Sequence, residues 1–275
     1  MKPKFTGIAL LSSILLVSAT SQTRPADNSL ETIKKYGWSA VPHAQSTLLK
    51  DVSPWEPANY TVAEIKVPDS EVVKQAVRYA KDHLPEQVFN HSMRVYYYAG
   101  AAIAEKHLPS FIPSLETYFL TCLFHDIGTT QENLHATLLS FEFYGGYLAL
   151  NQLQAYGAPR EQAESVTEAV IRHQDLGDIG SITSVGQLIQ LSTLFGVDNA
   201  GNNPTLISRQ TIESVVAAYP RGHWSSCFSH TIDKELELKP WAHSSAIPNF
   251  APSVAGNKLM EPWDALGRNI SCPAI

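Results

Sequence analysis

Residues 123–130 read Leu123-Phe124-His125-Asp126-Ile127-Gly128-Thr129-Thr130 and close an apolar run that begins at Tyr118. The run predicts a buried helix that starts near Ser114 and has Gly128 as its C-cap. Two polar side chains at the end of such a helix would be costly to bury without partners. A divalent metal ion offsets that cost, because the imidazole of His125 and the carboxylate of Asp126 both coordinate such ions. The pair therefore predicts a metal site.

Two further ligands can come from other helices. His91 precedes His125 by 34 positions, in Asn90-His91-Ser92-Met93-Arg94, and is expected on the otherwise apolar face of its helix. Asp198 follows Asp126 by 72 positions and closes the segment 191–198. Adjacent helical positions are only about 100° apart, so His125 and Asp126 can converge on one ion near a helix end. The predicted ligand set is therefore His91, His125, Asp126 and Asp198.

The chain as a whole is predicted to be all-α, a single helical bundle. Apolar residues recur at helical spacing, whereas period-two alternation is scarce and hairpin turn dipeptides are absent. Helices are expected near residues 29–36, 71–80, 87–107, 114–128, 132–154, 159–173, 184–198, 208–218 and 226–236. We expect four regions: a leader at 1–19, an irregular arm at 20–69, the metal-binding helical domain at 70–220, and a C-terminal tail at 221–275 that packs on it.

The N-terminus has the pattern of a secretory signal peptide. Lys2 and Lys4 precede an uncharged run from Ile8 to Val17, and small residues follow in a Val17-x-Ala19 cleavage pattern. The run is too short to span a bilayer, and the alternative interpretation is a buried N-terminal helix. We therefore expect the protein to be secreted or to enter the secretory pathway.

Composition and charge restrict the partners. Hydrophobic residues make up 44% of the 275 residues against 17% charged, which excludes a disordered chain. The net charge of −6 argues against a nucleic-acid surface or a polybasic membrane patch. Cys122 is expected in the core, whereas Cys227 and Cys272 could form a disulfide in an oxidising compartment.

The ordered set His…His-Asp…Asp on successive helices resembles the HD-domain metalloenzyme superfamily. Five blocks are similar to the fungal cyanamide hydratases: 123–130, Ser140-Phe141-Glu142-Phe143-Tyr144-Gly145-Gly146, Ile171-Arg172-His173-Gln174-Asp175, Tyr36-Gly37-Trp38-Ser39-Ala40-Val41-Pro42 and Lys239-Pro240-Trp241-Ala242-His243. The similarity runs from about Glu31 to Trp263. It implies an HD fold over 70–220, hydration of cyanamide to urea, and one zinc ion on the four ligands named above, with iron or manganese as alternatives. Unlike the members compared, which are expected inside the cell, this chain has an apparent export signal.

The reaction places further demands on the site. Cyanamide is a small, neutral nitrile, and zinc with an open position lowers the pKa of bound water toward roughly 7, which supplies hydroxide for attack on the nitrile carbon. The nitrile nitrogen then needs a proton donor. His173, at a helix end in an HD-type position, is the first candidate. Glu142, between Phe141 and Phe143, is the second, because a dry and unpaired carboxyl there would have a raised pKa.

Other roles stay open for these residues. Glu142 could instead orient a ligand histidine. His135 and His173 resemble the extra histidines that hold a second metal in some HD phosphodiesterases. Thr129 and Asp175 are candidates to support the ligands or a second metal, and Thr129 could equally cap the next helix.

Three rival functions also remain. The main one is an HD phosphohydrolase acting on a nucleotide or phosphodiester, but from His91 to Asp198 only four basic residues stand against eleven acidic ones. A purely structural metal is the second, although structural zinc usually has closed, Cys-rich coordination. The third keeps the hydratase chemistry with another small nitrile or isocyanide. Neither nucleic acid nor a membrane is an expected partner, and a homo-oligomer is possible.

Overall fold

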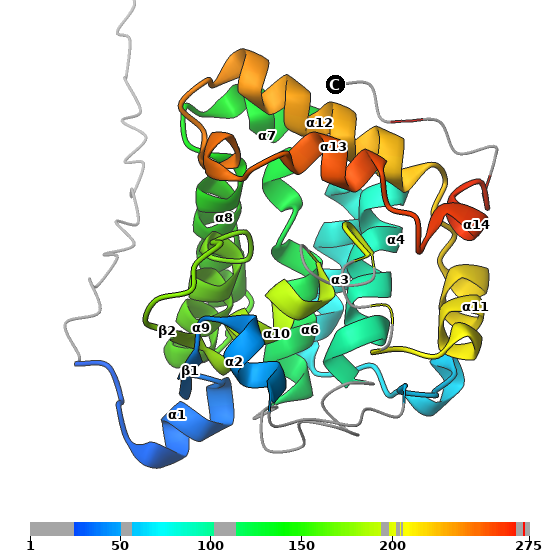
Figure 1. Ribbon diagram of the computed structural model, residues 1–275. Coiled ribbons are helices and arrows are strands. Elements are labelled where there is room, and N and C mark those ends of the chain that lie inside the picture. Colours follow the sequence, from blue (N-terminus) through cyan, green and yellow to red (C-terminus); the bar gives the residue numbers. More distant parts are fainter. Residues whose placement is uncertain are drawn as a thin grey trace, which may run out of the picture.

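The computed structural model describes residues 25–50, 57–101, 114–193, 198–201, 204, 206–267 and 272. It confirms the mostly α-helical fold, and the only strands in this part of the chain form one two-stranded pair (Figure 1). No helix in the described part combines the length and apolarity that crossing a membrane requires. The predicted signal peptide at 1–19 lies outside the described residues.

A central helix, α6 (Leu115–Phe124), organises the bundle. Eight of its residues, from Thr117 to Phe124, are buried, and it contacts helices on all sides. Its neighbours are α3 (Glu71–His83), α4 (Glu86–Val95), α8 (Phe141–Ala155), α9 (Arg160–Ile171) and α10 (Ser184–Ser192). Because α6 is surrounded, whatever follows its last turn also lies in the interior.

The remaining elements of the described part surround these helices or connect them. They are α1 (Leu30–Tyr36), α2 (Gln45–Lys50), α7 (Gln131–Ala136), α11 (Arg209–Ala218), α12 (Trp224–Leu238), α13 (Phe250–Ala255), α14 (Glu261–Asp264), the 3₁₀ turns η1 (Val62–Glu64), η3 (Ile127–Thr129) and η4 (His243–Ala246), and the π-helical turn η2 (Tyr96–Ala101). Ser70, Ser114 and Ser208 each cap a helix by accepting a hydrogen bond from a first-turn backbone N–H, which explains why these helices begin where they do.

The arm predicted as irregular contains regular structure. β1 (Ala40–Pro42) pairs antiparallel with β2 (Ser181–Thr183), with Val41 opposite Ile182. Helices α1 and α2 flank β1 in sequence. The pair joins the N-terminal arm to the segment that follows α9, so it positions the arm beside the end of that helix.

Three helix boundaries differ from the prediction. The helix expected at 114–128 ends at Phe124, and Gly128 lies in η3 instead of capping it. A Cβ at position 128 would lie 2.0 Å from the carbonyl oxygen of Phe141, so the glycine is needed for close approach of α8. The helix expected at 132–154 is broken between Ala136 and Phe141 into α7 and α8. The helix expected at 184–198 ends at Ser192.

The C-terminal segment holds the break between α7 and α8 in place. Lys239 Nζ donates to the carbonyl of Leu139 at 2.8 Å, and Trp241 Nε1 donates to that of Leu138 at 2.9 Å. Helices α12 and α13 lie across the end of the bundle at the top of Figure 1. Cys227 and Cys272, whose pairing the sequence left open, form a disulfide, and Cys122 is buried with a free thiol.

Candidate metal centre

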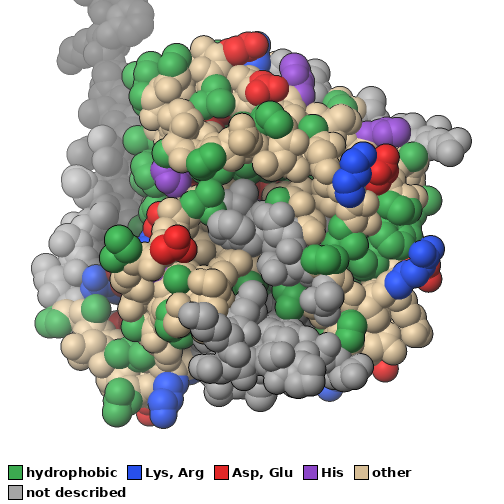
Figure 2. Space-filling view, in the orientation of Figure 1, with side chains coloured by type: hydrophobic (Ala, Val, Ile, Leu, Met, Phe, Trp, Pro, Cys, Tyr) green, Lys and Arg blue, Asp and Glu red, His purple; other side chains and the backbone are tan. Residues whose placement is uncertain are grey.

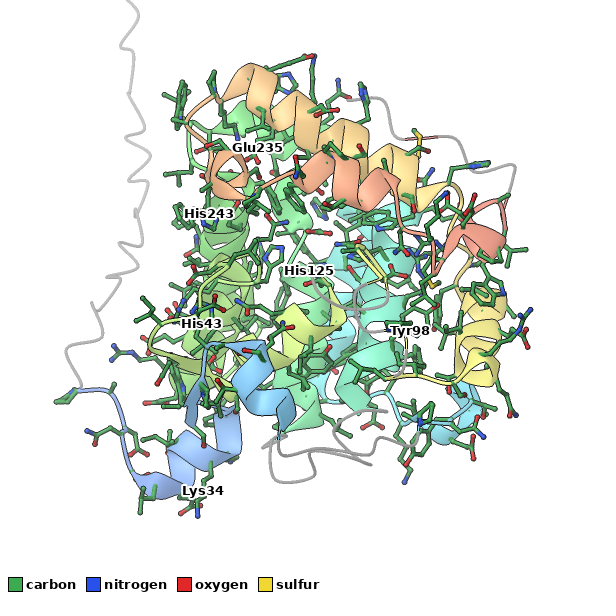
Figure 3. The ribbon with its side chains drawn as sticks, viewed as in Figure 1. Lys34, His43, Tyr98, His125, Glu235 and His243 are labelled. Atoms are coloured by element: carbon green, nitrogen blue, oxygen red, sulfur yellow. A yellow bond between two sulfur atoms is a disulfide. The ribbon has the colours of Figure 1, made fainter. Side chains whose placement is uncertain are left out.

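Three of the four predicted ligands converge in the interior of the bundle. His91 comes from α4, while His125 and Asp126 directly follow α6. His91 Nε2 lies 3.0 Å from His125 Nε2 and 3.4 Å from Asp126 Oδ2, and His125 Nε2 lies 3.2 Å from the same oxygen. All three side chains are fully or almost fully buried, and His125 lies between the helices in Figure 3.

The hydrogen bonds of the two rings show which atoms face one another. His91 Nδ1 lies 2.6 Å from Asp198 Oδ2, and His125 Nδ1 lies 2.8 Å from the carbonyl oxygen of Cys122. Because a carbonyl or carboxylate oxygen accepts, each Nδ1 carries the proton and each Nε2 presents a lone pair. Two imidazole lone pairs and a carboxylate oxygen thus meet with no donor between them, an arrangement that a cation stabilises.

The spacing of these three atoms fits a first-row metal ion. Ligand bonds of 2.0–2.2 Å in a tetrahedral site put neighbouring ligand atoms about 3.3 Å apart. The three observed separations, 3.0, 3.2 and 3.4 Å, lie around that value. Two nitrogens and one oxygen would leave the fourth position open, as in catalytic sites. The residues present therefore fit a metal ion.

Electrostatics keep His91 neutral and Asp126 ionised, the protonation states that a metal ligand needs, whereas His125 is shifted toward its protonated form in the absence of an ion. Burial lowers the pKa of His91 to about 4, so its ring is neutral at pH 7. Burial alone would raise the pKa of Asp126, but the surrounding histidines, His125 first, hold it well below its usual range. Burial alone would lower the pKa of His125, and the neighbouring Asp126 outweighs it and raises that pKa. Both oxygens of Asp126 lack a hydrogen-bond partner.

Asp198 contacts the ring nitrogen of His91 that faces away from Asp126. Its carboxylate accepts from His91 Nδ1, on the side of the ring away from Asp126, and also from Arg94 (3.0 Å) and Arg221 (2.7 Å). Burial opposes ionisation of Asp198, but the two guanidinium groups hold its pKa well below the usual range. In this geometry Asp198 supports His91 from behind and neutralises two buried cations, and its role as a fourth ligand stays a prediction.

The residues that enclose His91 were not predicted from the sequence. Trp224 stacks on its ring at 4.1 Å between centroids, and Phe228 stacks on Trp224 at 4.8 Å. Trp224 Nε1 donates to Asn199 Oδ1 at 2.7 Å. The hydrogen bond to Asp198 and the stacking of Trp224 together fix the orientation of the His91 ring. A buried Arg at position 94, one helical turn after His91, was the available signal, since a buried arginine requires a carboxylate partner.

His173 joins the group from the turn that follows a third helix, α9. Its Nδ1 lies 2.6 Å from the carbonyl of Val170, which leaves Nε2 as the free nitrogen. That Nε2 has no hydrogen-bond partner and lies 3.6 Å from Asp126 Oδ1. The ring stands edge-on to His125 and Phe141. A second polar atom that can exchange a proton thus faces the open side of Asp126.

Glu142 is fully buried but is not unpaired. Its Oε1 lies 2.6 Å from His243 Nδ1, while Oε2 has no partner. His243 belongs to the C-terminal segment and is not one of the converging histidines, so Glu142 does not orient a metal ligand. The hydrogen bond to Glu142 raises the pKa of His243.

Three other predicted residues lie outside the centre. His135 is exposed on α7, with Nδ1 on the carbonyl of Gln131, so it cannot join His173 around a second metal. Asp175 pairs with Arg172 at 2.9 Å. Thr129 Oγ1 donates to the carbonyl of Asp126 at 2.7 Å and thereby fixes the turn that carries a ligand. The helix cap that follows is Thr130.

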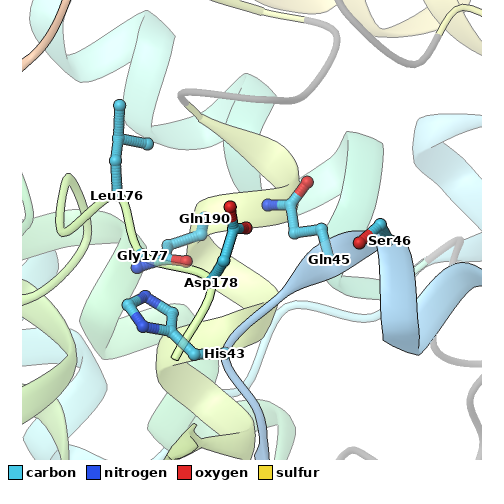
Figure 4. Close-up of a pocket in the computed structure, with 7 residues that line it drawn as sticks. All are labelled: His43, Gln45, Ser46, Leu176, Gly177, Asp178 and Gln190. Atoms are coloured by element: carbon cyan, nitrogen blue, oxygen red, sulfur yellow. The ribbon is translucent and has the colours of Figure 1, made fainter. Parts of the chain in front are cut away.

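Side chains that line a cavity of about 430 Å³ hold the turn that carries His173 (Figure 4). Gln190 Nε2 donates to the carbonyls of Arg172 (2.8 Å) and Asp175 (2.9 Å). His43 Nε2 donates to the same Asp175 carbonyl at 2.8 Å. The cavity is lined by His43, Gln45, Ser46, Leu176, Gly177, Asp178 and Gln190. Its walls therefore fix the turn on both sides of His173.

Comparison with known proteins identifies the family. No family model matches the chain. Cyanamide hydratase DDI2 and cyanamide hydratase DDI3 of Saccharomyces cerevisiae are each 38% identical to it over 227 residues, which are 82% of this chain and 98% of each relative. The similarity thus spans nearly the whole of both relatives and confirms the resemblance seen in the sequence blocks. The chain belongs to the cyanamide hydratase family.

Proposed function

We propose that this protein hydrates cyanamide to urea at a divalent metal ion held by His91, His125 and Asp126 in an HD-type site. The observation that carries the proposal is the convergence of three buried acceptor atoms at 3.0–3.4 Å with no donor among them. The names of the two yeast relatives supply the substrate. Zinc is the ion we propose, because two imidazoles and one carboxylate with an open position are typical ligands of catalytic zinc.

The chemistry requires one bond to form and two protons to move. A water oxygen bonds to the nitrile carbon, one π bond of the C≡N group breaks, and the nitrile nitrogen takes up a proton. A second proton passes from oxygen to nitrogen to give urea. The bound ion supplies a Lewis acid and lowers the pKa of a coordinated water. The protein must supply proton transfer, orientation and a dry cavity.

His173 is the group we assign to proton transfer. Its Nε2 is the only ring nitrogen of that side chain without a partner, and it faces the carboxylate oxygen of Asp126 that points away from His91 and His125. A proton held between His173 Nε2 and Asp126 Oδ1 is within reach of a reacting group at the centre. His173→Ala should therefore abolish turnover while most of the metal stays bound.

Orientation comes from Asp198 and Trp224. Asp198 fixes the tautomer of His91 by accepting from Nδ1, which turns the Nε2 lone pair toward the centre. Trp224 fixes the ring plane. A ligand placed by two neighbours in this way needs no rearrangement to bind an ion.

The phosphohydrolase alternative is disfavoured by where the arginines point. Arg94 is fully buried and bonded to Asp198, Arg160 is paired with Glu164, and Arg172 is paired with Asp175. On the face shown in Figure 2, the Lys and Arg side chains are scattered and form no continuous patch. A polyanionic substrate would thus find no free cation among these three.

The test is a comparison of substrates on purified protein. Urea from cyanamide, lost in His125→Ala together with the metal, would support the proposal. Hydrolysis of 4-nitrophenyl phosphate or of bis(4-nitrophenyl) phosphate without urea formation would establish the rival. Acetonitrile and a small isocyanide test the remaining alternative substrates.

We also propose that the protein is exported, with cleavage after residue 19. The disulfide between Cys227 and Cys272 supports this, because such bonds persist in oxidising compartments. N-terminal sequencing of the mature protein tests the proposal. A mature chain that still carries residues 1–19 would contradict it.

A further inference from the structure

Several unpartnered polar atoms belong to residues of the candidate centre or to their neighbours in sequence and packing. The described part of the chain has eight buried side-chain N or O atoms without a partner, and five of them belong to Asp126, Glu142, His173 and Gln174. Buried polar atoms are normally hydrogen-bonded, so a cluster of exceptions requires a ligand or a functional reason. A bound metal ion would satisfy the oxygens of Asp126, and a shared proton would satisfy His173 Nε2. Glu142 Oε2 and Gln174 Oε1 are then the two atoms of this group whose lack of a partner has no explanation.

The packing of α8 shows where Glu142 faces. Glu142, Gly145 and Gly146 lie at i, i+3 and i+4 and therefore share one face of the helix. An added Cβ at Gly145 would touch Ile127 and the backbone N of Gly128, and one at Gly146 would clash with Ile171. This face thus packs on the turn after Asp126 and on the last turn of α9.

On this face of α8, Glu142 lies one helical turn nearer the start of the helix than Gly145 and Gly146 do. Because α8 and α9 are consecutive helices packed along one another, the start of α8 lies beside the segment that follows α9, residues 172–175. Two observations agree with this. The Phe141 ring contacts the His173 ring, with centroids 5.7 Å apart, and Asp175 acts electrostatically on His243, the partner of Glu142. Gln174 directly follows His173 and is 1% exposed.

We propose that Glu142 Oε2 and Gln174 Oε1 accept the two N–H bonds of the cyanamide amino group and so select a nitrile that carries –NH₂. This inference rests on the proposed function and names its specificity determinants. The amino group offers two donors and lies at the end of the linear molecule opposite the reacting nitrile nitrogen. Both oxygens are acceptors in a buried setting, where a matched donor is worth most.

His243 is the positioning residue of this arrangement. It bonds Oε1 of Glu142 at 2.6 Å and stacks on Phe143, with centroids 6.1 Å apart, so the carboxylate is held by one oxygen and offers the other. Figure 3 places His243 beside the upper end of α8. The other buried carboxylate nearby, Glu235, has both oxygens occupied, by the backbone N of Phe141 and the hydroxyl of Ser244, each at 2.7 Å.

The physical consequence is discrimination against nitriles without N–H donors. Acetonitrile has a methyl group in the place of the amino group. If it bound, the Glu142 oxygen would be left buried and unpaired, which costs affinity. The acceptors act on a part of the substrate that does not react, so their loss should raise KM more than it lowers kcat.

The test compares cyanamide with acetonitrile on metal-loaded variants. Glu142→Gln and Gln174→Met are near-isosteric, and Glu235→Gln is the matched control for a buried carboxylate in the same cluster. For cyanamide, we expect each of the first two to lose about 10- to 100-fold in kcat/KM, mainly through KM. The acetonitrile constant, measured as turnover or as inhibition of cyanamide hydration, should stay within about threefold. Glu235→Gln should change neither constant by more than about threefold.

Metal content and thermal unfolding complete the design, because they separate a folding defect from a lost contact. Gln174→Met keeps the inference testable if Glu142→Gln does not fold. Equal losses for cyanamide and acetonitrile, or an unchanged KM for cyanamide in both variants, would overturn the inference. The latter result would mean that ordinary buried water satisfies these oxygens. A metal-loaded wild type that forms no urea would instead refute the proposed function itself.

Discussion

Replacing Asp198 by Asn separates two roles that a carboxylate near a metal can have. Asp198 accepts from Arg94 at 3.0 Å and Arg221 at 2.7 Å, and all three side chains are fully buried. Arg94 has only the carbonyls of Tyr219 and Pro220 as its other described acceptors. The substitution therefore leaves a buried guanidinium without its counter-charge.

The expected loss of unfolding free energy follows from the burial of this ion pair. Removing one partner of a buried ion pair typically costs about 3–5 kcal/mol. Arg221 keeps Asp264 at 3.0 Å, so we expect Asp198→Asn to lie at the lower end, about 3 kcal/mol of unfolding free energy. The loss should be present in metal-free protein. Metal affinity should fall by about 10- to 100-fold, because His91 loses the group that fixes its tautomer.

Asp126→Asn is the matched control. Asp126 has neighbouring histidines but no guanidinium partner among the described residues, so in metal-free protein the change should cost less unfolding free energy than Asp198→Asn does. Metal binding should be lost. The assay is urea denaturation of chelated protein, with metal affinity measured separately by competition with a chelator.

One outcome would refute this reasoning. If Asp198→Asn left the metal-free stability unchanged and abolished metal binding as fully as Asp126→Asn does, Asp198 would be a ligand and not a counter-ion. A loss of stability accompanied by partial loss of affinity is what the contacts of Asp198 require.

Further predictions concern Gly128 in the turn after Asp126, the pair of His243 with Glu142, and the disulfide. Gly128→Ala should destabilise the fold by about 3 kcal/mol or more and impair metal retention, because its Cβ would lie 2.0 Å from the Phe141 carbonyl oxygen; wild-type melting and metal content would contradict this. The pKa of His243 is raised by Glu142, so its contribution to stability is complete below about pH 6.5 and is lost as the pH rises through the folded-state pKa. The difference in melting temperature between wild type and His243→Asn should therefore shrink from pH 5.5 to 8.5, and a constant difference would exclude the charged pair. Cys227→Ser should cost up to about 4 kcal/mol, given the 45-residue separation of the bridge, and reduction of the wild type should reproduce the loss in unfolding free energy.

The sequence predicted the chemistry of the centre better than its geometry. His125 and Asp126 could be identified because they close an apolar run, and His91 because it completes the ordered set His…His-Asp on successive helices. Residue type alone does not show which ring nitrogen a carboxylate will meet, and this is why the contact of Asp198 with His91 Nδ1 could not be predicted. The two arginines that donate to the Asp198 carboxylate are Arg94 and Arg221, and only the folded chain brings them together.

The helical fold was predictable from periodicity, and the boundaries were not. The break between α7 and α8 carries no Gly or Pro, and it is held open by Lys239 and Trp241, about a hundred residues away in sequence. The role of Gly128 likewise depends on the carbonyl of Phe141. His243, which holds Glu142, has no local signal at all, because its function arises from a contact across 101 positions.

The most direct test of the central claim is urea formation from cyanamide by purified protein, before chelation, after chelation and after zinc is added back. Urea should appear, disappear with the chelator and return with about one zinc ion per chain. Protein that holds this zinc and forms no urea would contradict the proposed reaction, and urea formation that persists in metal-free protein would contradict the role of the centre.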